Sequence, residues 1–201
     1  MKTEELSLRS SLRRGLEVLE AFLRDQGNLV RLDLVATLLA DRLRDGGKAL
    51  ACGNGGSATQ AVHFAEELTG RFRTDRRPLA ALACADVGHI TCTANDFGFQ
   101  HVFSRWIEAL GRPRDVLLLL STSGNSTNLV LATEAARAGG ITTVALLGGS
   151  GGKLAGTCDY EWIVPADSPD RVQEVHMLIL HGLIEGVERI LFPELWPSYG
   201  E

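Results

Sequence analysis

Four hydroxyl side chains lie in one short loop near the middle of the chain. The loop follows an apolar run at 116–120, precedes a helical stretch, and contains Ser121, Thr122, Ser123 and Ser126. Gly124 lets the backbone approach a ligand closely, and the N-terminus of the next helix offers free N–H groups. Helix capping is the alternative, but four hydroxyls in six residues exceed what a cap needs. The loop therefore predicts a site for a phosphate monoester, and it lacks the GxxxxGK[ST] pattern of a Walker A loop.

A second glycine-rich loop has a similar build. Asn54, Gly55, Gly56 and Ser57 follow the first apolar run and open a helix. Such a turn by itself serves packing as often as binding. Two such loops in one small domain favour a sugar phosphate as the ligand. A third glycine cluster, at 148–152, has fewer hydroxyls and is interpreted as structural.

Ionisable residues follow at helical spacing. His63 and Glu67 are four residues apart, so they share a helix face and can share a proton or a metal ion; an exposed polar pair is the more common outcome. The last helix carries Gln173 and His181, which lie about 80° apart around the axis and about 12 Å apart along it. To bind one ion, their side chains must lean together or the helix must deform. His176 stands among aliphatic residues and is interpreted as a core histidine.

Three further polar residues have two interpretations each. Asn95 and Asp96 lie in a stretch that suits a turn, although an amide and a carboxylate could also bind sugar hydroxyls. Arg71 could contact a phosphate or remain a solvated surface side chain. The sequence leaves both alternatives open.

The elements that must position these residues alternate between strand and helix. Apolar runs predict strands at 48–52, 79–84, 116–120, 142–147 and 160–164, and helical periodicity appears at 4–24, 30–44, 57–68, 100–110, 128–138 and 169–191. Strands that are apolar on both faces and alternate with helices predict a parallel sheet covered on both sides. We expect one α/β domain at 47–192, with an N-terminal helical extension at 1–46, which packs on the domain or on a neighbouring subunit, and a tail at 193–201.

Composition excludes several classes of protein. The 201 residues are 45% hydrophobic and 22% charged, which is typical of a globular domain. The net charge of −5 argues against nucleic-acid binding, and no apolar run is long enough for a membrane span or a secretory signal. The four cysteines form no CxxC pair, so we expect reduced core thiols in a cytoplasmic protein.

Several motifs together extend the interpretation. The chain resembles the sugar isomerase (SIS) family, and within it the phosphoheptose isomerases, from about Lys48 to Glu188, in the motifs CGNGGS, HFAEELTGRF, NDFGFQHVFSR, STSGNS, GGKLAG and RVQEVHMLILH. The resemblance implies a flavodoxin-like parallel sheet and a homotetramer with active sites at subunit interfaces. It also implies conversion of sedoheptulose 7-phosphate to D-glycero-D-manno-heptose 7-phosphate, commonly with zinc. That reaction is the first step toward ADP- or GDP-heptose, a precursor of lipopolysaccharide.

The same resemblance assigns roles by motif. Phosphate binding falls to Ser57, Ser121, Thr122, Ser123 and Ser126. The sugar is contacted by Asn54, Gly55, Gly56, Glu67, Arg71, Asn95, Asp96, Asp170 and Gln173. The zinc ligands are His63, Glu67, Gln173 and His181.

Glu67 and His181 form the implied acid–base pair. Aldose–ketose exchange through an enediol needs a base, an acid and stabilisation of a developing oxyanion. Zinc, by polarising the carbonyl, meets the last need. We expect Glu67 to abstract the C1 proton of the ketose and His181 to return a proton at the neighbouring carbon, although the two roles could be exchanged.

A non-catalytic function is the alternative. The tail at 192–197 resembles that of a non-enzymatic SIS relative that binds the bacterial replication initiator. Such a tetramer, or a sensor of sugar phosphates, would not need His63, Glu67 and His181 together. Their joint presence favours the enzyme.

Overall fold

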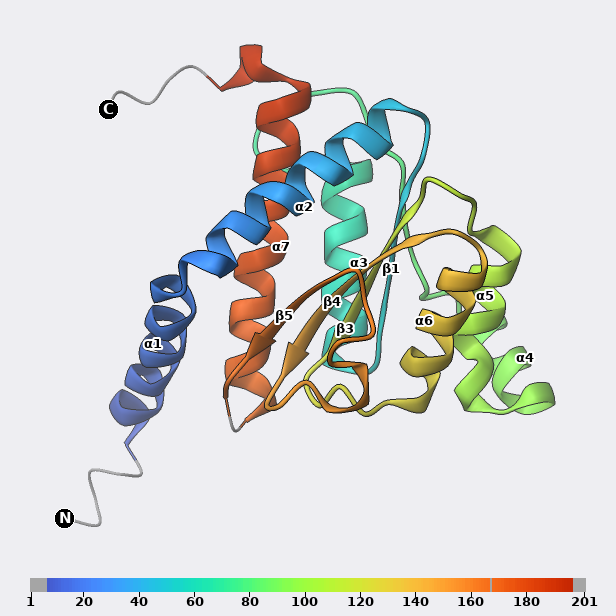
Figure 1. Ribbon diagram of the computed structural model, residues 1–201, viewed down its shortest axis with the longest axis horizontal. Helices are drawn as coiled ribbons and strands as arrows, with labels where there is room; N and C mark the ends of the chain where they lie inside the picture. The colour runs from blue at the N-terminus through green and yellow to red at the C-terminus, as the bar shows by residue number, and fades with distance from the viewer. Residues whose placement is uncertain (1–6, 167, 197–201) are drawn as a thin grey trace.

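The computed structural model describes residues 7–166 and 168–196 (Figure 1). The α-helices of this part are α1 (Leu8–Arg24), α2 (Gln26–Arg44), α3 (Gly56–Thr69), α4 (Val87–Phe97), α5 (Val102–Leu110), α6 (Thr127–Ala138) and α7 (Pro169–Leu191). The strands are β1 (Ala49–Gly53), β2 (Ala81–Ala83), β3 (Val116–Ser121), β4 (Thr142–Gly148) and β5 (Tyr160–Val164), and short 3-10 helices occupy Phe99–His101, Gly152–Leu154 and Pro193–Leu195. No helix in the described ranges has both the length and the hydropathy of a membrane span.

The strands form one parallel sheet in the order β2-β1-β3-β4-β5. This is the flavodoxin-like order, and it confirms the predicted fold class. The order reverses between β1 and β3, and ligands of such sheets bind outside the carboxyl ends of the strands at that point. Both polar loops predicted from the sequence begin there.

Helices cover both faces of the sheet (Figure 1). Val116, Leu118 and Leu120 of β3 pack with α2, α3 and α7, whereas Leu117 and Leu119 pack with α5 and α6. All five side chains are fully buried. Burial on both faces explains why the strand is apolar without alternation.

The two N-terminal helices differ in burial. In α2, Val35 and Leu39 belong to the core, so this helix is part of the domain packing. In α1, Leu8 is 85% and Leu12 is 71% exposed. The gap between the two predicted helices, residues 25–29, shrinks to the single residue Asp25, whose carboxylate accepts the Gly27 N–H as the N-cap of α2.

Helix α4 is a correction, because the sequence predicted no helix there and gave the stretch around Asn95 as a turn or a sugar-binding segment. The structure places Asn95 and Asp96 in the last turn of α4. Asp86 is the N-cap residue of this helix, and its carboxylate accepts the His89 N–H at 2.7 Å. Val87, Ile90, Ala94 and Phe97 do recur at helical spacing, but Gly88 and the β-branched Ile90 and Thr91 have low intrinsic helix propensity.

The thiols are partly as expected. All four cysteines are free. Cys52 and Cys84 are buried, and burial raises the pKa of Cys84 to about 12. Cys92 on α4 is exposed and Cys158 is half-buried, so the expectation of four core thiols was wrong for these two.

Helix α7 crosses α2 at close range. A Cβ on Gly186 would lie 2.6 Å from the Cβ of Ala36, and one on Gly182 would lie 3.0 Å from Leu32 Cδ2. The first contact is with a rigid methyl group that cannot rotate away. Glycine at position 186 therefore determines how near the two helices approach.

We predict that Gly186→Ala lowers the free energy of unfolding by about 1–3 kcal/mol, because the added methyl group overpacks the crossing. The loss should occur although alanine favours a helix by about 1 kcal/mol. Urea unfolding measures it, with Gly88→Ala in α4 as the control, since a Cβ there meets only the Asp86 carboxylate. Equal stability of the two variants would contradict the prediction.

His176 of α7 is a core residue, as the sequence favoured. It has no exposed surface, and its Nε2 lies 3.1 Å from the Leu147 carbonyl oxygen. Burial lowers the pKa of His176 from 6.5 to about 4, although the hydrogen bond to Leu147 opposes this shift. The imidazole is therefore neutral in the folded protein at neutral pH.

This shift predicts a loss of stability in acid. Between pH 6.5 and about 4 the unfolded chain binds a proton at His176 that the folded chain does not. The free energy of unfolding should therefore decrease as the pH is lowered across this interval, by up to about 3 kcal/mol. Urea midpoints should show a shallower decline for His176→Gln, and parallel declines would refute the assignment.

Candidate active site

The two polar loops meet at the carboxyl edge of the sheet. Gly53 of β1 is paired in register with Leu120 of β3, so the segments that follow these strands lie side by side. Together they enclose a small pocket of about 50 Å³, lined by Asn54, Ser57, Leu120, Ser121, Thr122, Ser123 and Ser126. The structure thus brings together every hydroxyl residue that the sequence assigned to phosphate.

Hydrogen bonds hold the loops in place. Ser121 Oγ accepts the Gly124 N–H at 3.0 Å, and the amides of Asn54 and Asn128 bond each other in both directions at 3.0 and 2.9 Å. Ser126 is the N-cap residue of α6, yet within the described chain its side chain makes no capping bond. Helix capping therefore does not account for the hydroxyl of Ser126.

The third glycine cluster, residues 148–152, packs against the loop that contains Ser121, Ser123 and Ser126. Gly124 has φ +62°, and a Cβ on it would collide with the carbonyl of Gly151. Leu154 donates its N–H to the Gly124 carbonyl at 3.1 Å. This packing supports the structural interpretation of residues 148–152.

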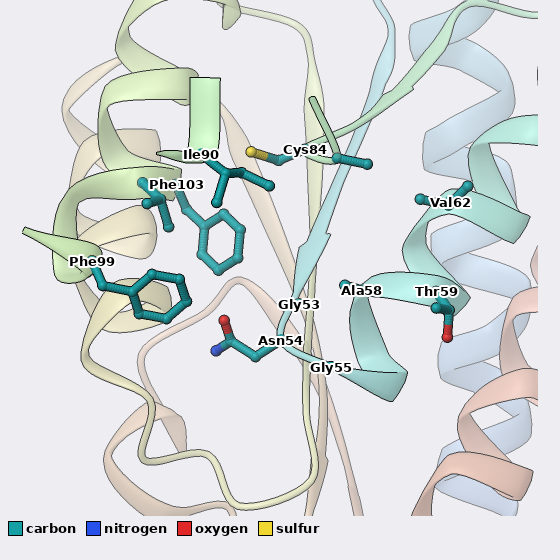
Figure 2. A pocket seen from close by; sticks show the side chains of 12 residues that line it. Gly53, Asn54, Gly55, Ala58, Thr59, Val62, Cys84, Ile90, Phe99 and Phe103 are labelled. Atoms are coloured by element: carbon teal, nitrogen blue, oxygen red, sulfur yellow. The ribbon is translucent and has the colours of Figure 1, made fainter. Parts of the chain in front are cut away.

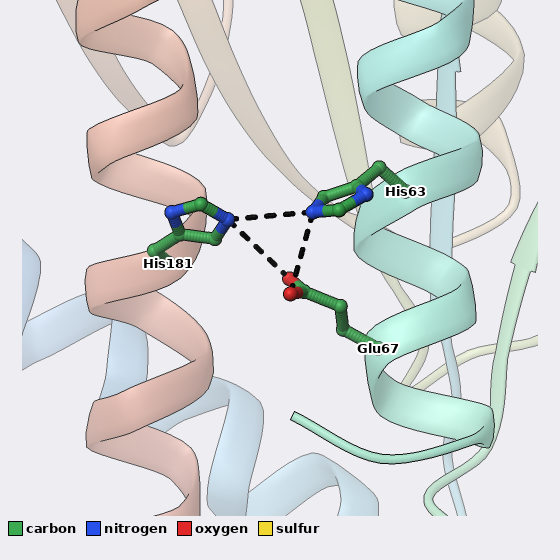
Figure 3. A group of neighbouring side chains, drawn as sticks. All are labelled: His63, Glu67 and His181. Carbon is green, nitrogen blue, oxygen red and sulfur yellow. Dashed lines mark hydrogen bonds and ion pairs between the residues drawn. The ribbon is translucent and has the colours of Figure 1, made fainter. Parts of the chain in front are cut away.

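A cluster of three ionisable side chains lies between α3 and α7 (Figure 3). His63 Nε2 is 3.3 Å from Glu67 Oε1, and His181 Nε2 is 3.7 Å from Glu67 Oε2. The two imidazole Nε2 atoms are 3.4 Å apart. One ligand atom from each residue lies within 4.8 Å of the other two, so the three groups converge on one point.

The cluster is half open to solvent. The Glu67 side chain is 12% exposed, whereas those of His63 and His181 are 45% and 42% exposed. The Phe72 ring lies beside His181, with ring centroids 5.8 Å apart. A hollow of about 330 Å³ adjoins the two histidines, between α3 and α7, with room for part of a ligand.

The donor set fits a zinc ion. Glu67 Oε2 is buried and has no hydrogen-bond partner among the described residues, which is costly unless a cation or a ligand satisfies it. Imidazole nitrogen and carboxylate oxygen are zinc ligands, and catalytic zinc sites use three protein ligands and leave one position open. His63, Glu67 and His181 could therefore hold the ion with a position free for substrate.

Gln173 lies away from this cluster. Its side-chain amide lies against Gly56, where an added Cβ would be 2.6 Å from Gln173 Nε2. Its backbone carbonyl accepts a hydrogen bond from Gln60 Nε2 at 2.7 Å. Gly56 precedes His63 by seven residues, about 10 Å along α3. The structure thus puts the Gln173 side chain at the phosphate-loop end of α3, and its role as a fourth ligand stays a prediction.

The remaining predicted residues are exposed. Arg71 follows the end of α3, and Asn95 donates to Asp96 at 2.7 Å on α4, which packs with α5 on the opposite face of the sheet from α7. Asp170 stands in the first turn of α7, where hydrogen bonds from Ser168 and Arg171 lower its pKa to about 2. Within one chain the structure therefore does not bring Asn95 and Asp96 to the histidine cluster.

An apolar pocket of about 430 Å³ adjoins the first glycine loop (Figure 2). Val62 of α3, Ile90 of α4 and the rings of Phe99 and Phe103 line it, and Asn54 borders both this pocket and the phosphate pocket. No sequence motif points to this pocket, because its walls come from separate segments of the chain.

Comparison with known proteins agrees with these features. Residues 14–148 match the model of the SIS domain. A phosphoheptose isomerase of Fusobacterium nucleatum is 51% identical over 189 residues, which cover 94% of this chain and 97% of that protein. One from an Enterobacter species is 50% identical over 183 residues, covering 90% and 95%. The chain belongs to the phosphoheptose isomerase family.

Solved structures of family members have the same fold. A phosphoheptose isomerase from Francisella tularensis superposes with a TM-score of 0.83 at 33% identity, over 90% of this chain and 96% of the other. One from Neisseria gonorrhoeae gives 0.79 at 39% identity, over 90% and 99%. The boundaries proposed for this family member, 1–46, 47–192 and 193–201, stay a prediction; residues 1–6 and 197–201 lie outside the described chain.

We predict that the protein binds one equivalent of zinc through the cluster. Glu67→Gln should weaken zinc affinity by about tenfold or more, because it removes the anionic ligand. Titration against a chromophoric chelator measures this affinity. Glu66→Gln is the control, since Glu66 is the neighbouring carboxylate and is exposed on the helix. Equal affinities of the two variants would exclude Glu67 as a ligand.

Proposed function

We propose that this chain isomerises sedoheptulose 7-phosphate to D-glycero-D-manno-heptose 7-phosphate. The observation that carries the proposal is the cluster of His63, Glu67 and His181, two of whose residues lie on the helix, α3, that also contributes Ser57 to the hydroxyl-lined pocket. The names of the family members, phosphoheptose isomerases at about half identity over most of the chain, support the same activity.

The spacing of the two sites supports a long substrate. Ser57, in the phosphate pocket, and His63, in the cluster, are six residues apart on α3, about 9 Å along the axis and about 120° apart around it. An extended seven-carbon chain of bonds of about 1.5 Å each has a similar length. With its phosphate among the hydroxyls, such a sugar would present C1 and C2 to the cluster.

Proton transfer in this proposal falls to Glu67 and His181. Glu67 has two carboxylate oxygens, so one could accept the C1 proton of the ketose while the other binds the ion; Oε2 receives no hydrogen bond from the described protein and Oε1 lies 3.3 Å from His63 Nε2. His181 lies 3.7 Å from Oε2 on the other wall of the groove and would return a proton at C2. Two groups this close could each serve one of two adjacent carbons, which suits transfer through an enediol with either residue as base, while the O1 proton passes to O2 to complete the exchange.

Zinc is the proposed cofactor. His63, Glu67 and His181 would hold it, with Gln173 as the predicted fourth ligand. When bound, a zinc ion supplies Lewis-acid stabilisation of the oxyanion that develops on the sugar oxygen. Orientation of the sugar would fall to Asn54, Gly55, Gly56 and the exposed Arg71 and Asp170.

We also propose a cytoplasmic homotetramer with active sites at subunit interfaces. The exposed leucines of α1, Leu8, Leu12 and Leu16, form an apolar stripe that a second copy would cover. Asn95 and Asp96 lie across the sheet from the cluster, so their predicted contact with the sugar would come from a neighbouring chain. Nothing in the described chain favours a replication regulator or a sugar-phosphate sensor over the enzyme.

Proton NMR in deuterium oxide tests the activity. The zinc-loaded protein should convert sedoheptulose 7-phosphate to a product with an aldose anomeric signal and solvent deuterium at C2. Glu67→Gln and His181→Ala should each lower the rate by about 10²-fold or more, because each removes one proton-transfer group. The control variant Glu66→Gln should keep the wild-type rate.

Absence of turnover by the zinc-loaded wild type would overturn the proposal. If the sugar phosphate still bound, the sensor or the replication regulator would become the better interpretation. Turnover that survives both substitutions would retain the isomerase and exclude the acid–base pair.

A further inference from the structure

A buried arginine lies at the end of the helix that carries Glu67. Arg76 belongs to the connection between α3 and β2, yet its side chain has no exposed surface. Its partner Glu188 on α7 is 1% exposed. Charged groups are rarely removed from water to this extent unless each is paired and hydrogen-bonded.

The guanidinium of Arg76 has four short contacts. Its Nε donates to Glu188 Oε1 at 2.8 Å. Nη2 donates to the Glu67 carbonyl at 2.6 Å, and Nη1 donates to the carbonyls of Leu68 and Gly70 at 2.9 and 3.1 Å. The last carbonyls of a helix have no intrahelical partner, and a cation is favourable at that end. Arg76 thus caps α3 and joins it to α7 with one planar group.

Both ends of this bridge lead to the histidine cluster. The carbonyl that accepts Nη2 belongs to Glu67 itself, and Glu188 follows His181 by seven residues, two turns of α7. Sliding α3 along α7 would break the buried pair and expose the end of the helix. The bridge therefore holds the backbone of Glu67 at a set separation from the helix of His181.

We propose that Arg76 and Glu188 are positioning residues that hold Glu67 and His181 at the separation needed for zinc binding and for the isomerisation proposed above, on which this inference rests. Neither contacts the cluster with its own charged group; they act through the backbone of α3 and the packing of α7. A misplacement of about 1 Å at reacting groups can cost about 10²-fold in rate. The same loop carries Phe72, which packs on His181, so its anchor at Arg76 also supports that contact.

Arg76→Lys tests the proposal, because lysine keeps the charge and loses the planar fork that reaches three carbonyls. We expect kcat to fall by about 10-fold to 10²-fold and the affinity for zinc alone to fall by about tenfold. KM for the sugar phosphate should change by less than about threefold, because the phosphate pocket lies at the other end of α3. Glu188→Gln should behave in the same way and serves if the lysine variant does not fold.

A second ion pair with a buried carboxylate supplies the control. Lys48 and Asp115 pair at 2.5 Å at the amino ends of β1 and β3, and their side chains are 22% and 2% exposed. Asp115→Asn should lower the urea midpoint as the other variants do, while kcat and zinc affinity stay at wild-type values. All assays are run where urea curves show that each variant is folded.

The proposal is overturned if Arg76→Lys and Glu188→Gln retain both kcat and zinc affinity, or if Asp115→Asn loses them to the same extent. Failure of the isomerase itself is distinguishable. If the wild type does not turn over, the proposed function fails, and the zinc affinities of the same variants still decide whether the bridge positions the cluster.

Discussion

Helix α7 packs against both α2 and α3, and these two contacts determine where His181 lies. On one side, the absence of a side chain at Gly186 lets α7 approach Ala36 of α2 closely. On the other side, the buried pair of Arg76 and Glu188 ties α7 to the end of α3. Since buried ion pairs are costly to break and close helix contacts are intolerant of added volume, both contacts resist sliding. The convergence of His63, Glu67 and His181 depends on this arrangement.

The parallel sheet provides the other half of the site. β1 and β3 are neighbours at the point where the strand order reverses. The loops after Gly53 and Ser121 therefore begin at the same edge of the sheet. Helix α3 begins in one of these loops and carries His63 and Glu67 two to three turns later. A single rigid helix thus sets the distance between the hydroxyl-lined pocket and the histidine cluster. Sites built on regular elements hold such distances better than sites built on loops.

This geometry suits chemistry at one end of a substrate that is bound at the other. Hydroxyls and backbone N–H groups can hold a phosphate without a buried positive charge, and the pocket between the two loops is lined by such neutral donors. The cluster combines a nearly buried carboxylate with two half-exposed imidazoles, so proton-accepting and metal-binding groups meet at the edge of an open groove. Membership of the phosphoheptose isomerase family is consistent with a phosphorylated sugar as the substrate.

Local patterns were sufficient to predict the sheet, most helix bounds, the two polar loops and the pairing of His63 with Glu67, because each depends on spacing within a few residues. Other features follow from contacts between residues more than a hundred positions apart. His181 reaches Glu67, and Arg76 reaches Glu188, only because α3 and α7 pack together, and no local spacing encodes that packing. For the same reason the position of the Gln173 amide at Gly56 was not foreseen. Helix α4 was missed although Val87, Ile90, Ala94 and Phe97 recur at helical spacing, because glycine and β-branched residues give this segment a low intrinsic helix propensity. Periodicity along the chain reports which faces are buried, whereas the partners of those faces are decided by how the elements pack.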